Sequence, residues 1–322
     1  MATTLEAFNA EEKKTAKILL ATQVAMMMGR KFEEGDWSSV YCRTKGIPEQ
    51  TWSNLHIDVM HEGLGVEQKM LCVRPKRSLM EFAGTTQMHP SATRSIRIAS
   101  TDVSPNDAMQ DVLRQYKELI EHRTHKVEKT SKSNEADMRT GWLLWERSLT
   151  EFLYFEERMS APDPEMFYAE WNERGAEGSR KGSKNLWIYE ADTGKKRYSI
   201  TTNAGAKIQP YFDVPPPNNE NMFFFRVQGE DIGAGKILIW ITSSTARELE
   251  SILGALNPTV LSDAILRAAL HFTQNQRDVV ERSKLAIPIE ITKDAYDKLL
   301  ATWGGVSDEH RAQLLVQALR RI

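Results

Sequence analysis

The alternation of apolar and polar side chains divides the first half of the chain into helices and strands. Apolar residues recur at helical spacing over Ala10–Gly29 and again from Pro105 to about Lys129, which predicts a helix in each segment. Between them, two short apolar runs, Leu55–Met60 and Val66–Val73, flank a turn that contains two glycines. Branched and apolar side chains around glycine are typical of two strands joined by a loop.

A further strand and an aromatic segment complete this half. We expect a strand at Ser95–Ala99. Aromatic residues recur through about Met138–Met159 at helical spacing, which predicts a second long helix that serves as core or dimer contact. Two prolines, Pro162 and Pro164, end the segment, and we place a domain boundary after residue 162.

The second half changes character. Residues 165–245 contain short apolar runs separated by turn residues, which predicts a β-rich region, whereas 245–283 has helical spacing. The tail, 285–322, is expected to form one strand and two helices. The expected strands are Leu186–Glu190, Arg197–Thr201, Met222–Val227, Lys236–Thr242 and Ala286–Ile291, and the expected helices are Thr245–Leu256, Thr259–Phe272, Lys293–Trp303 and Ser307–Arg320.

Composition and charge limit the class of protein. The chain has 322 residues, of which 41% are hydrophobic and 27% charged, so it can bury a sizeable core in two domains or in one with appendages. Its net charge of −2 excludes a global basic field. The longest apolar stretch, Ile18–Met28, is too short to cross a bilayer, and the N-terminus lacks a signal-peptide pattern. With only two cysteines, Cys42 and Cys72, a cytoplasmic protein with reduced thiols is expected.

Several established catalytic motifs are missing from the sequence. There is no Gly-x-x-x-x-Gly-Lys-Ser/Thr loop, which argues against ATP-driven translocation. There is also no Cys and His set with zinc spacing and no Gly-x-Ser-x-Gly segment, so a zinc centre and a serine hydrolase are disfavoured.

Charged residues inside the apolar runs are the strongest candidates for chemistry. Side chains alternate across a strand, so Glu67 and Lys69 share one face, and a hairpin can bring Asp58 beside them. Two converging carboxylates repel each other, and Mg²⁺, which prefers oxygen ligands, removes that repulsion. A neighbouring lysine can orient or deprotonate a water and offset the charge that develops on a phosphate.

Asp58, followed by eight residues and then Glu67-Gln68-Lys69, resembles the Asp…Glu-x-Lys signature of the PD-(D/E)XK, or restriction-endonuclease-like, nuclease superfamily. The resemblance implies that Asp58 and Glu67 bind Mg²⁺, that Gln68 adds its backbone carbonyl, and that Lys69 serves the attacking water. Ile57 stands where the family often has proline.

The resemblance also implies a fold. Helix–strand–strand–strand–helix is the order expected of an α/β nuclease core, a mixed central sheet flanked by helices, here over residues 1–162. Residues 163–322 would then be a β-rich α+β region for DNA recognition and dimerisation. Members of the family often add an acidic residue from the first helix, and Glu33 or Glu34 can play that part, with Glu34 as our candidate. An exposed acidic turn is the alternative interpretation of this pair.

A chance match is the alternative to the nuclease interpretation. Glu-x-Lys triplets arise about once in a chain of this size. Glu11-Glu12-Lys13 is another, in a helical context without a strand or a partner Asp. The apolar residues on both sides of Glu67-Gln68-Lys69, its loop and Asp58 favour a nuclease over a solvated hairpin with a surface ion pair.

Two segments are candidates for DNA contact. Residues 85–100 combine hydroxyl side chains with Arg94 and Arg97, which suits phosphate contacts but also a solvated loop. Residues 171–207 interleave basic and aromatic side chains, which suits nucleic acid backbone and bases, with an ordinary β-rich domain as the alternative. The basic candidates there are Arg180, Lys181, Lys184, Lys195, Lys196 and Arg197.

The strand–helix–helix order of the tail resembles the ribbon-helix-helix fold of small dimeric DNA-binding proteins. In that family the exposed strand positions read the major groove with polar or basic side chains. Here Ala286, Pro288 and Glu290 alternate with isoleucines, and none is a good base reader. We therefore expect the tail to be a packing or dimerisation element, with Ser307 capping its last helix. No internal repeat is visible in the sequence.

Together these features predict a Mg²⁺-dependent, sequence-specific DNA endonuclease, a restriction enzyme that cuts double-stranded DNA with a metal-activated water. A homodimer is expected, because one such centre cuts one strand and a two-fold dimer presents two centres to both strands. A cognate methyltransferase that acts on the same site is the implied companion, and no membrane association is expected. The alternatives are a non-enzymatic DNA-binding regulator and a nuclease-fold protein that binds without cutting.

Overall fold

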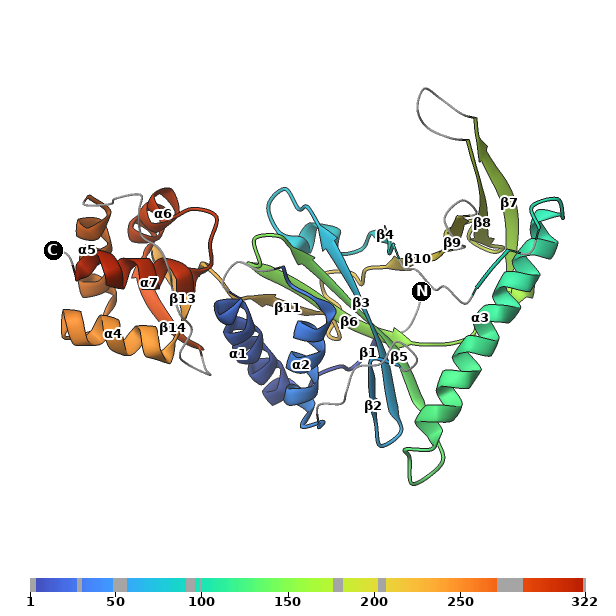
Figure 1. Ribbon diagram of the computed structural model, residues 1–322, viewed down its shortest axis with the longest axis horizontal. Coiled ribbons are helices and arrows are strands. Elements are labelled where there is room, and N and C mark those ends of the chain that lie inside the picture. Colours follow the sequence, from blue (N-terminus) through green and yellow to red (C-terminus); the bar gives the residue numbers. More distant parts are fainter. Residues whose placement is uncertain are drawn as a thin grey trace.

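The computed structural model describes residues 4–27, 31–48, 57–90, 96–98, 100–175, 182–201, 207–270 and 286–320. The mixed α/β class expected from the sequence is confirmed, and the described strands form three sheets. The C-terminal helices lie at one end of the molecule, and the long helix α3 (Pro105–Glu128) lies at the other (Figure 1). None of the helices described is long and apolar enough to cross a membrane.

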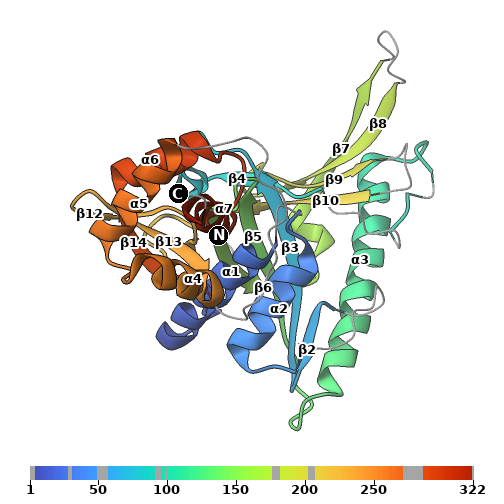
Figure 2. The same cartoon turned by 60° about the vertical axis from the view of Figure 1, so that its left-hand side comes forward.

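The first sheet carries the residues proposed for chemistry. β3 and β5 are parallel neighbours in it, and the remaining pairs are antiparallel. Two helices, α1 (Ala10–Met26) and α2 (Glu34–Lys45), pack on one face, and α3 approaches the other (Figure 2). The strands run in the order β1 (Thr4–Leu5), β6 (Glu151–Arg158), β5 (Asp137–Glu146), β3 (Leu64–Val73) and β2 (Val59–His61), with β11 (Phe223–Arg226) also paired to β6.

The two helices at the start of the chain, of which only α1 was predicted from the sequence, have clear local causes. Asn9 Oδ1 accepts hydrogen bonds from the backbone N–H groups of Glu11 and Glu12 at 3.0 and 2.9 Å, which satisfies donors that the first turn of α1 leaves unpaired. α2 ends at Gly46, whose φ of 67° is a left-handed conformation that favours glycine. The predicted helix that begins at Ala10 is therefore confirmed over its described residues, as is the one that begins at Pro105.

The aromatic segment 138–159 is a pair of strands, and the predicted helix is wrong. β5 and β6 are antiparallel neighbours, joined by a turn in which Leu149 has a φ of 57°. Neither is an edge strand, and strands buried on both faces lose the alternation that marks a half-exposed one. Spacing alone cannot distinguish such a run from a buried helix. Core and dimer contact were the two roles expected for this segment, and Phe152, Leu153 and Tyr154 are fully buried in the core of the chain.

The second sheet is antiparallel, and α3 packs on one of its faces. The predicted strands at 186–190 and 197–201 are confirmed, whereas residues 96–98 are not in a strand. β4 precedes residue 162 in the chain and joins this second sheet, and β11 follows residue 162 and joins the first sheet. Segments from both sides of residue 162 thus share each sheet, and the domain boundary there stays a prediction. The strand order is β4 (Thr86–Met88), β10 (Lys207–Asp213), β9 (Lys196–Thr201), β8 (Ser183–Glu190) and β7 (Phe167–Arg174).

The C-terminal unit is an internal repeat, which corrects the expectation that the chain contains none. Two strand–helix–helix copies follow each other at an offset of 50 residues, as the starts at Lys236 and Ala286 show. Their strands pair antiparallel, with Ile239 opposite its own equivalent, Ile289. The predicted tail is thus confirmed, including Ser307 as an N-cap, but it is one of two copies. The copies are β13 (Lys236–Thr242), α4 (Ser243–Leu253) and α5 (Pro258–Leu270), then β14 (Ala286–Thr292), α6 (Lys293–Thr302) and α7 (Asp308–Leu319), with β12 (Glu230–Gly233) added at the edge.

The outer face of the β13–β14 pair is covered by α1. Thr22 Oγ1 accepts a hydrogen bond from the backbone N–H of Ala286 at 2.9 Å, and Lys17 Nζ lies 5.8 Å from the centre of the Trp240 ring. Trp240 and Ala286 are buried in the same apolar cluster as α1. The strand of the tail therefore packs inside the chain, against the first helix.

Candidate active site

The β2–β3 hairpin brings the proposed residues together at the edge of the first sheet. Asp58 directly precedes β2, and its Oδ2 accepts a hydrogen bond from the backbone N–H of Gln68 at 2.7 Å. Glu67 and Lys69 share one face of β3, and Lys69 Nζ lies 2.6 Å from Glu67 Oε1. Glu34, the first residue of α2, is close enough to Asp58, Glu67 and Lys69 to interact with each electrostatically. The four charged residues proposed from the sequence thus form one cluster.

The side chain of Gln68 lies on the opposite face of β3 from the charged cluster. Its Oε1 accepts hydrogen bonds from Trp37 Nε1 and from the Tyr154 hydroxyl, both at 3.2 Å. A Cβ at Gly141 would collide with this Gln68 oxygen and with the Tyr154 hydroxyl, so only glycine leaves room for the contact. The packing fixes the orientation of β3 and thereby the side on which Glu67 emerges. The metal-binding role of the Gln68 carbonyl stays a prediction.

Burial and crowding shift the pKa values of the cluster. Burial, followed by the negative charges of Glu67 and Glu34, raises the pKa of Asp58 to about 8. Burial also raises the pKa of Glu34. Burial alone would raise the pKa of Glu67, but the positive charges of Lys69 and Arg123 lower it. The fold therefore disfavours full ionisation of the carboxyl groups without an added cation.

Arg123 belongs to the cluster and was not predicted. Its Nη1 lies 3.0 Å from Glu67 Oε2, so the carboxylate is held by Lys69 through one oxygen and by Arg123 through the other. Arg123 continues the helical spacing of Tyr116 and Ile120 on the inner face of α3. The sequence signal for Arg123 is a charged residue on the face of α3 that Tyr116 and Ile120 make otherwise apolar.

His89 also lies beside the cluster. Its Nε2 lies 2.9 Å from the carbonyl oxygen of Met70, and its ring meets Trp142 edge-on with 5.8 Å between centroids. Burial lowers the pKa of His89 to about 4, so the ring is neutral near pH 7 and Nε2 donates to the carbonyl. His89 is therefore a packing group here and not a cation for phosphate.

Arg197 on β9, one of the proposed DNA contacts, lines a cavity that Glu67 and Lys69 also line. It pairs there with Glu190 at 2.7 Å and with Asp213 at 2.9 Å. Arg94, Arg180 and Lys181 lie outside the described residues, and Arg97 is exposed.

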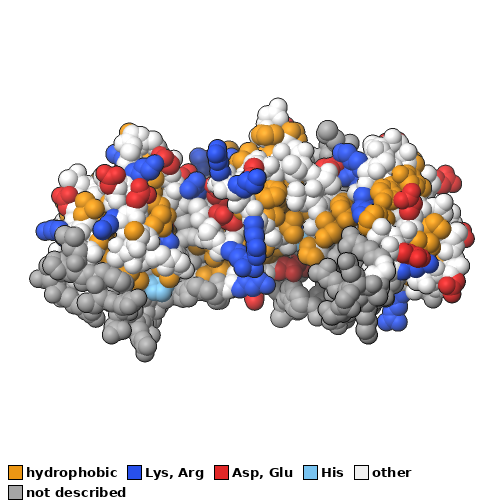
Figure 3. Space-filling view, turned by 90° about the horizontal axis from the view of Figure 1, so that it is seen from above, with side chains coloured by type: hydrophobic (Ala, Val, Ile, Leu, Met, Phe, Trp, Pro, Cys, Tyr) orange, Lys and Arg blue, Asp and Glu red, His pale blue; other side chains and the backbone are white. Residues whose placement is uncertain are grey.

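The lysines proposed for DNA contact have partners within the second sheet. On the face seen in Figure 3, Lys and Arg side chains gather near the middle, between the C-terminal unit and α3. For the lysines of the second sheet, contact with DNA stays a prediction. The contacts are Lys184 with Glu173 at 2.9 Å, Lys195 with Asp213 at 3.4 Å, and Lys196 with the Trp187 ring, 3.1 Å from Nζ to the centroid.

The carboxylate oxygens of the cluster suit a hard cation, although these carboxylates do not converge on a single point. Asp58, Glu67 and Glu34 offer the oxygen ligands that Mg²⁺ prefers. Within the described residues, no three His, Cys, Asp or Glu side chains are arranged to surround a metal ion. Glu67 is turned toward Lys69 and Arg123 instead, so a metal ion would compete with Arg123 for Glu67 Oε2.

Comparison with known proteins gives no relative on which to base a function. No family model matches the chain, no curated protein matches it, and no solved structure matches it.

Proposed function

We propose that this chain is a Mg²⁺-dependent endonuclease that hydrolyses phosphodiester bonds of DNA. The observation that supports it most is the cluster of Asp58, which directly precedes β2, with Glu67 and Lys69 on β3, joined by Glu34 from α2. The first three occupy the positions of the PD-(D/E)XK signature, which the sequence resembles. The raised pKa of Asp58 supports the same assignment, because a site built for a cation gathers more negative charge than its own side chains balance.

Each residue of the cluster has a separate role in this proposal. A bound Mg²⁺ supplies a Lewis acid and a water of lowered pKa. Asp58 and Glu67 would hold the metal, and Glu34 and the backbone carbonyl of Gln68 would offer further oxygen ligands. Burial alone would lower the pKa of Lys69, but Glu67 raises it, so Lys69 is protonated near neutral pH. It therefore suits orientation of the water and stabilisation of phosphate charge better than removal of a proton.

The wider proposal is a restriction enzyme. It would act in the cytoplasm on double-stranded DNA as a homodimer, beside a methyltransferase that protects the same sequence. The second sheet adjoins the cluster through the cavity that Arg197 lines, which supports a role for that sheet in holding the substrate.

Plasmid incubated with the protein in Mg²⁺, with EDTA as the control, tests the proposal. Discrete fragments are expected for a restriction enzyme, whereas smearing indicates a nonspecific nuclease. Asp58→Ala should lose cleavage and keep DNA binding, because a metal ligand is removed while the phosphate contacts remain. Equal cleavage in EDTA, or cleavage by Asp58→Ala at the wild-type rate, would contradict the assignment. A mobility shift without product would favour a DNA-binding regulator.

A further inference from the structure

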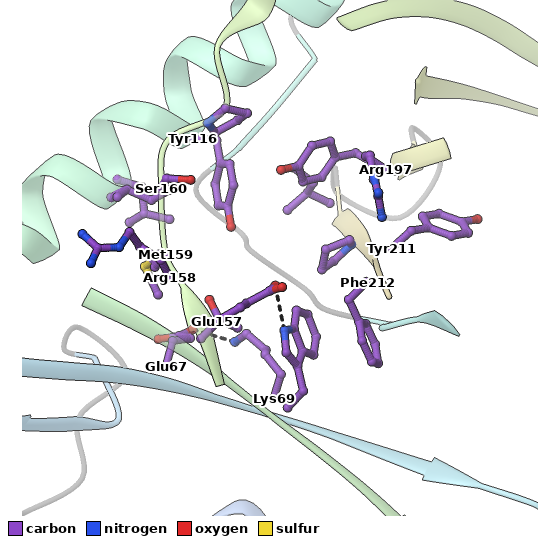
Figure 4. A pocket seen from close by; sticks show the side chains of 18 of the residues that line it. Glu67, Lys69, Tyr116, Glu157, Arg158, Met159, Ser160, Arg197, Tyr211 and Phe212 are labelled. Atoms are coloured by element: carbon purple, nitrogen blue, oxygen red, sulfur yellow. Dashed lines mark hydrogen bonds and ion pairs between the residues drawn. The ribbon is translucent and has the colours of Figure 1, made fainter. Parts of the chain in front are cut away.

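A cavity of about 440 Å³ opens directly beside Glu67 and Lys69 (Figure 4). Its floor is one face of the first sheet, on which Glu67, Thr140 and Glu157 lie in a row across β3, β5 and β6. Adjacent strands are ~4.8 Å apart, so Glu157 lies roughly 10 Å from Glu67 along the floor. Small-molecule sites occupy roughly 300–1,000 Å³, so the cavity has room for one small ligand.

Aromatic side chains from five elements, α3, β5, β7, β9 and β10, line the cavity. Tyr116 reaches into it from α3 (Figure 4), and Tyr211 on β10 lies at its edge. Trp142 and Phe212 stack on each other with 3.9 Å between centroids and 12° between planes. Flat aromatic faces on several sides suit a planar ligand.

The charges at the two ends of the cavity are paired. Lys69 and Arg123 share the carboxylate of Glu67 at one end, and Arg197 is held by Glu190 and Asp213 at the other. A pocket for a second phosphate is expected to present cations free to form charge-assisted hydrogen bonds. Arg158 also lines the cavity, at an exposed position. The buried part of the cavity beyond Lys69 therefore suits an uncharged planar group better than another phosphate, with Arg158 at its rim.

Glu157 provides a hydrogen-bonding edge within these aromatic walls. Trp142 Nε1 donates to Glu157 Oε1 at 2.8 Å, which holds the carboxyl group in the cavity (Figure 4). Burial raises the pKa of Glu157. A carboxyl group accepts a hydrogen bond from the exocyclic amino group of cytosine or adenine in either protonation state, and when protonated it also donates one to the ring nitrogen beside that amino group.

We propose that this cavity receives one unstacked nucleobase next to the phosphate cleaved at Lys69, with Glu157 on its hydrogen-bonding edge. The inference rests on the proposed nuclease function for the position of that phosphate. Enzymes that take a base out of the helix hold it by stacking and by hydrogen bonds to its pairing edge. The preferred substrate then carries, beside the cut, a nucleotide that is unpaired or is flipped out of the duplex.

Titration calorimetry with the four deoxynucleoside monophosphates tests the site, with deoxyribose 5-phosphate as the probe that lacks a base. We expect the nucleotides to bind at least about tenfold more tightly than the sugar phosphate, with dCMP or dAMP the tightest, because stacking and one or two hydrogen bonds are added. Glu157→Leu should abolish the preference among bases. Glu157→Gln should keep it, because an amide also donates and accepts.

Two further variants keep the test independent of folding. Tyr211→Ala removes a partly exposed wall of the cavity and should weaken nucleotide binding without disturbing the core. Tyr168→Ala is the matched control, because this tyrosine stacks on Tyr189 in the same sheet and does not line the cavity. It should bind nucleotides as the wild type does.

The outcomes separate the cavity from the chemistry. Wild-type protein that cleaves DNA but binds nucleotides no better than deoxyribose 5-phosphate overturns the nucleobase site and leaves the nuclease proposal intact. Wild-type protein that binds nucleotides in a Glu157-dependent manner, yet never cleaves DNA, supports the nucleobase site and overturns the nuclease.

Discussion

Replacing Asp58 with asparagine removes a charge that the folded chain disfavours. Burial and the nearby carboxylates of Glu67 and Glu34 raise the pKa of Asp58 from 3.8 to about 8. The folded chain therefore binds this proton more tightly than the unfolded chain does, and the free energy of unfolding decreases as pH rises from about 4 to about 8. Asparagine removes this dependence, while its side-chain oxygen can still accept the hydrogen bond from Gln68.

The size of the effect follows from the pKa difference and from the surroundings. Each tenfold change in proton affinity corresponds to about 1.4 kcal/mol. Asp58 is only partly buried at the sheet edge, so Lys69 and water can adjust when it ionises. We expect the free energy of unfolding of Asp58→Asn to exceed that of the wild type by about 1–3 kcal/mol near pH 8.5, and by much less near pH 5.

Urea denaturation of both proteins at the two pH values, in EDTA, measures this difference. Adding Mg²⁺ near pH 8.5 should then stabilise the wild type more than Asp58→Asn, because a ligand that binds only the folded state raises the free energy of unfolding. An equal difference at both pH values would refute the reasoning, as would a variant no more stable than the wild type near pH 8.5.

Three further predictions concern packing, recognition and assembly. Gly141→Ala should lower the free energy of unfolding by about 2–4 kcal/mol in urea denaturation, because its Cβ collides with Tyr154, whereas Gly35→Ala, with open space around it, should not. Sedimentation should show a dimer on DNA, and monomer alone, both free and on DNA, would reject that assembly. Neutralising three basic residues together should make the slope of log affinity against log salt shallower by about one for each lost phosphate contact, as measured by binding titrations at several salt concentrations. An unchanged slope would place recognition elsewhere. Those residues are Arg180, Lys181 and Lys184.

The sequence could predict the part of the site that lies within one hairpin. Asp58, Glu67 and Lys69 are separated by a turn and by strand alternation, which local pattern determines. Arg123 reaches the same carboxylate from α3, and its position depends on how that helix packs between the two sheets. No local pattern contains that information. The sequence therefore shows the charge of Arg123 on the inner face of the helix, but not that Glu67 is its partner.

Different physical reasons explain why the sequence pattern did not predict the strands β5, β6 and β10. β5 and β6 are apolar on both faces, so their spacing also fits a buried helix. β10 contains Pro210, and proline inside an apolar run argues against a strand, yet this proline sits opposite Tyr198 in the second sheet. The two C-terminal copies share few identical residues, among them buried isoleucines such as Ile239 and Ile289, so burial preserves their common fold with little sequence identity.

Single-turnover cleavage of DNA in Mg²⁺ by Lys69→Ala, beside Lys13→Ala, tests the central claim most directly. Both lysines end a Glu-x-Lys triplet, but Lys13 is exposed on α1 and Lys69 is bound to Glu67 in the cluster. We predict that Lys69→Ala cleaves roughly 10²-fold more slowly or worse while it still binds DNA, and that Lys13→Ala cleaves at the wild-type rate. Cleavage by Lys69→Ala at close to the wild-type rate, or an equal loss in both variants, would contradict the assignment of the active site.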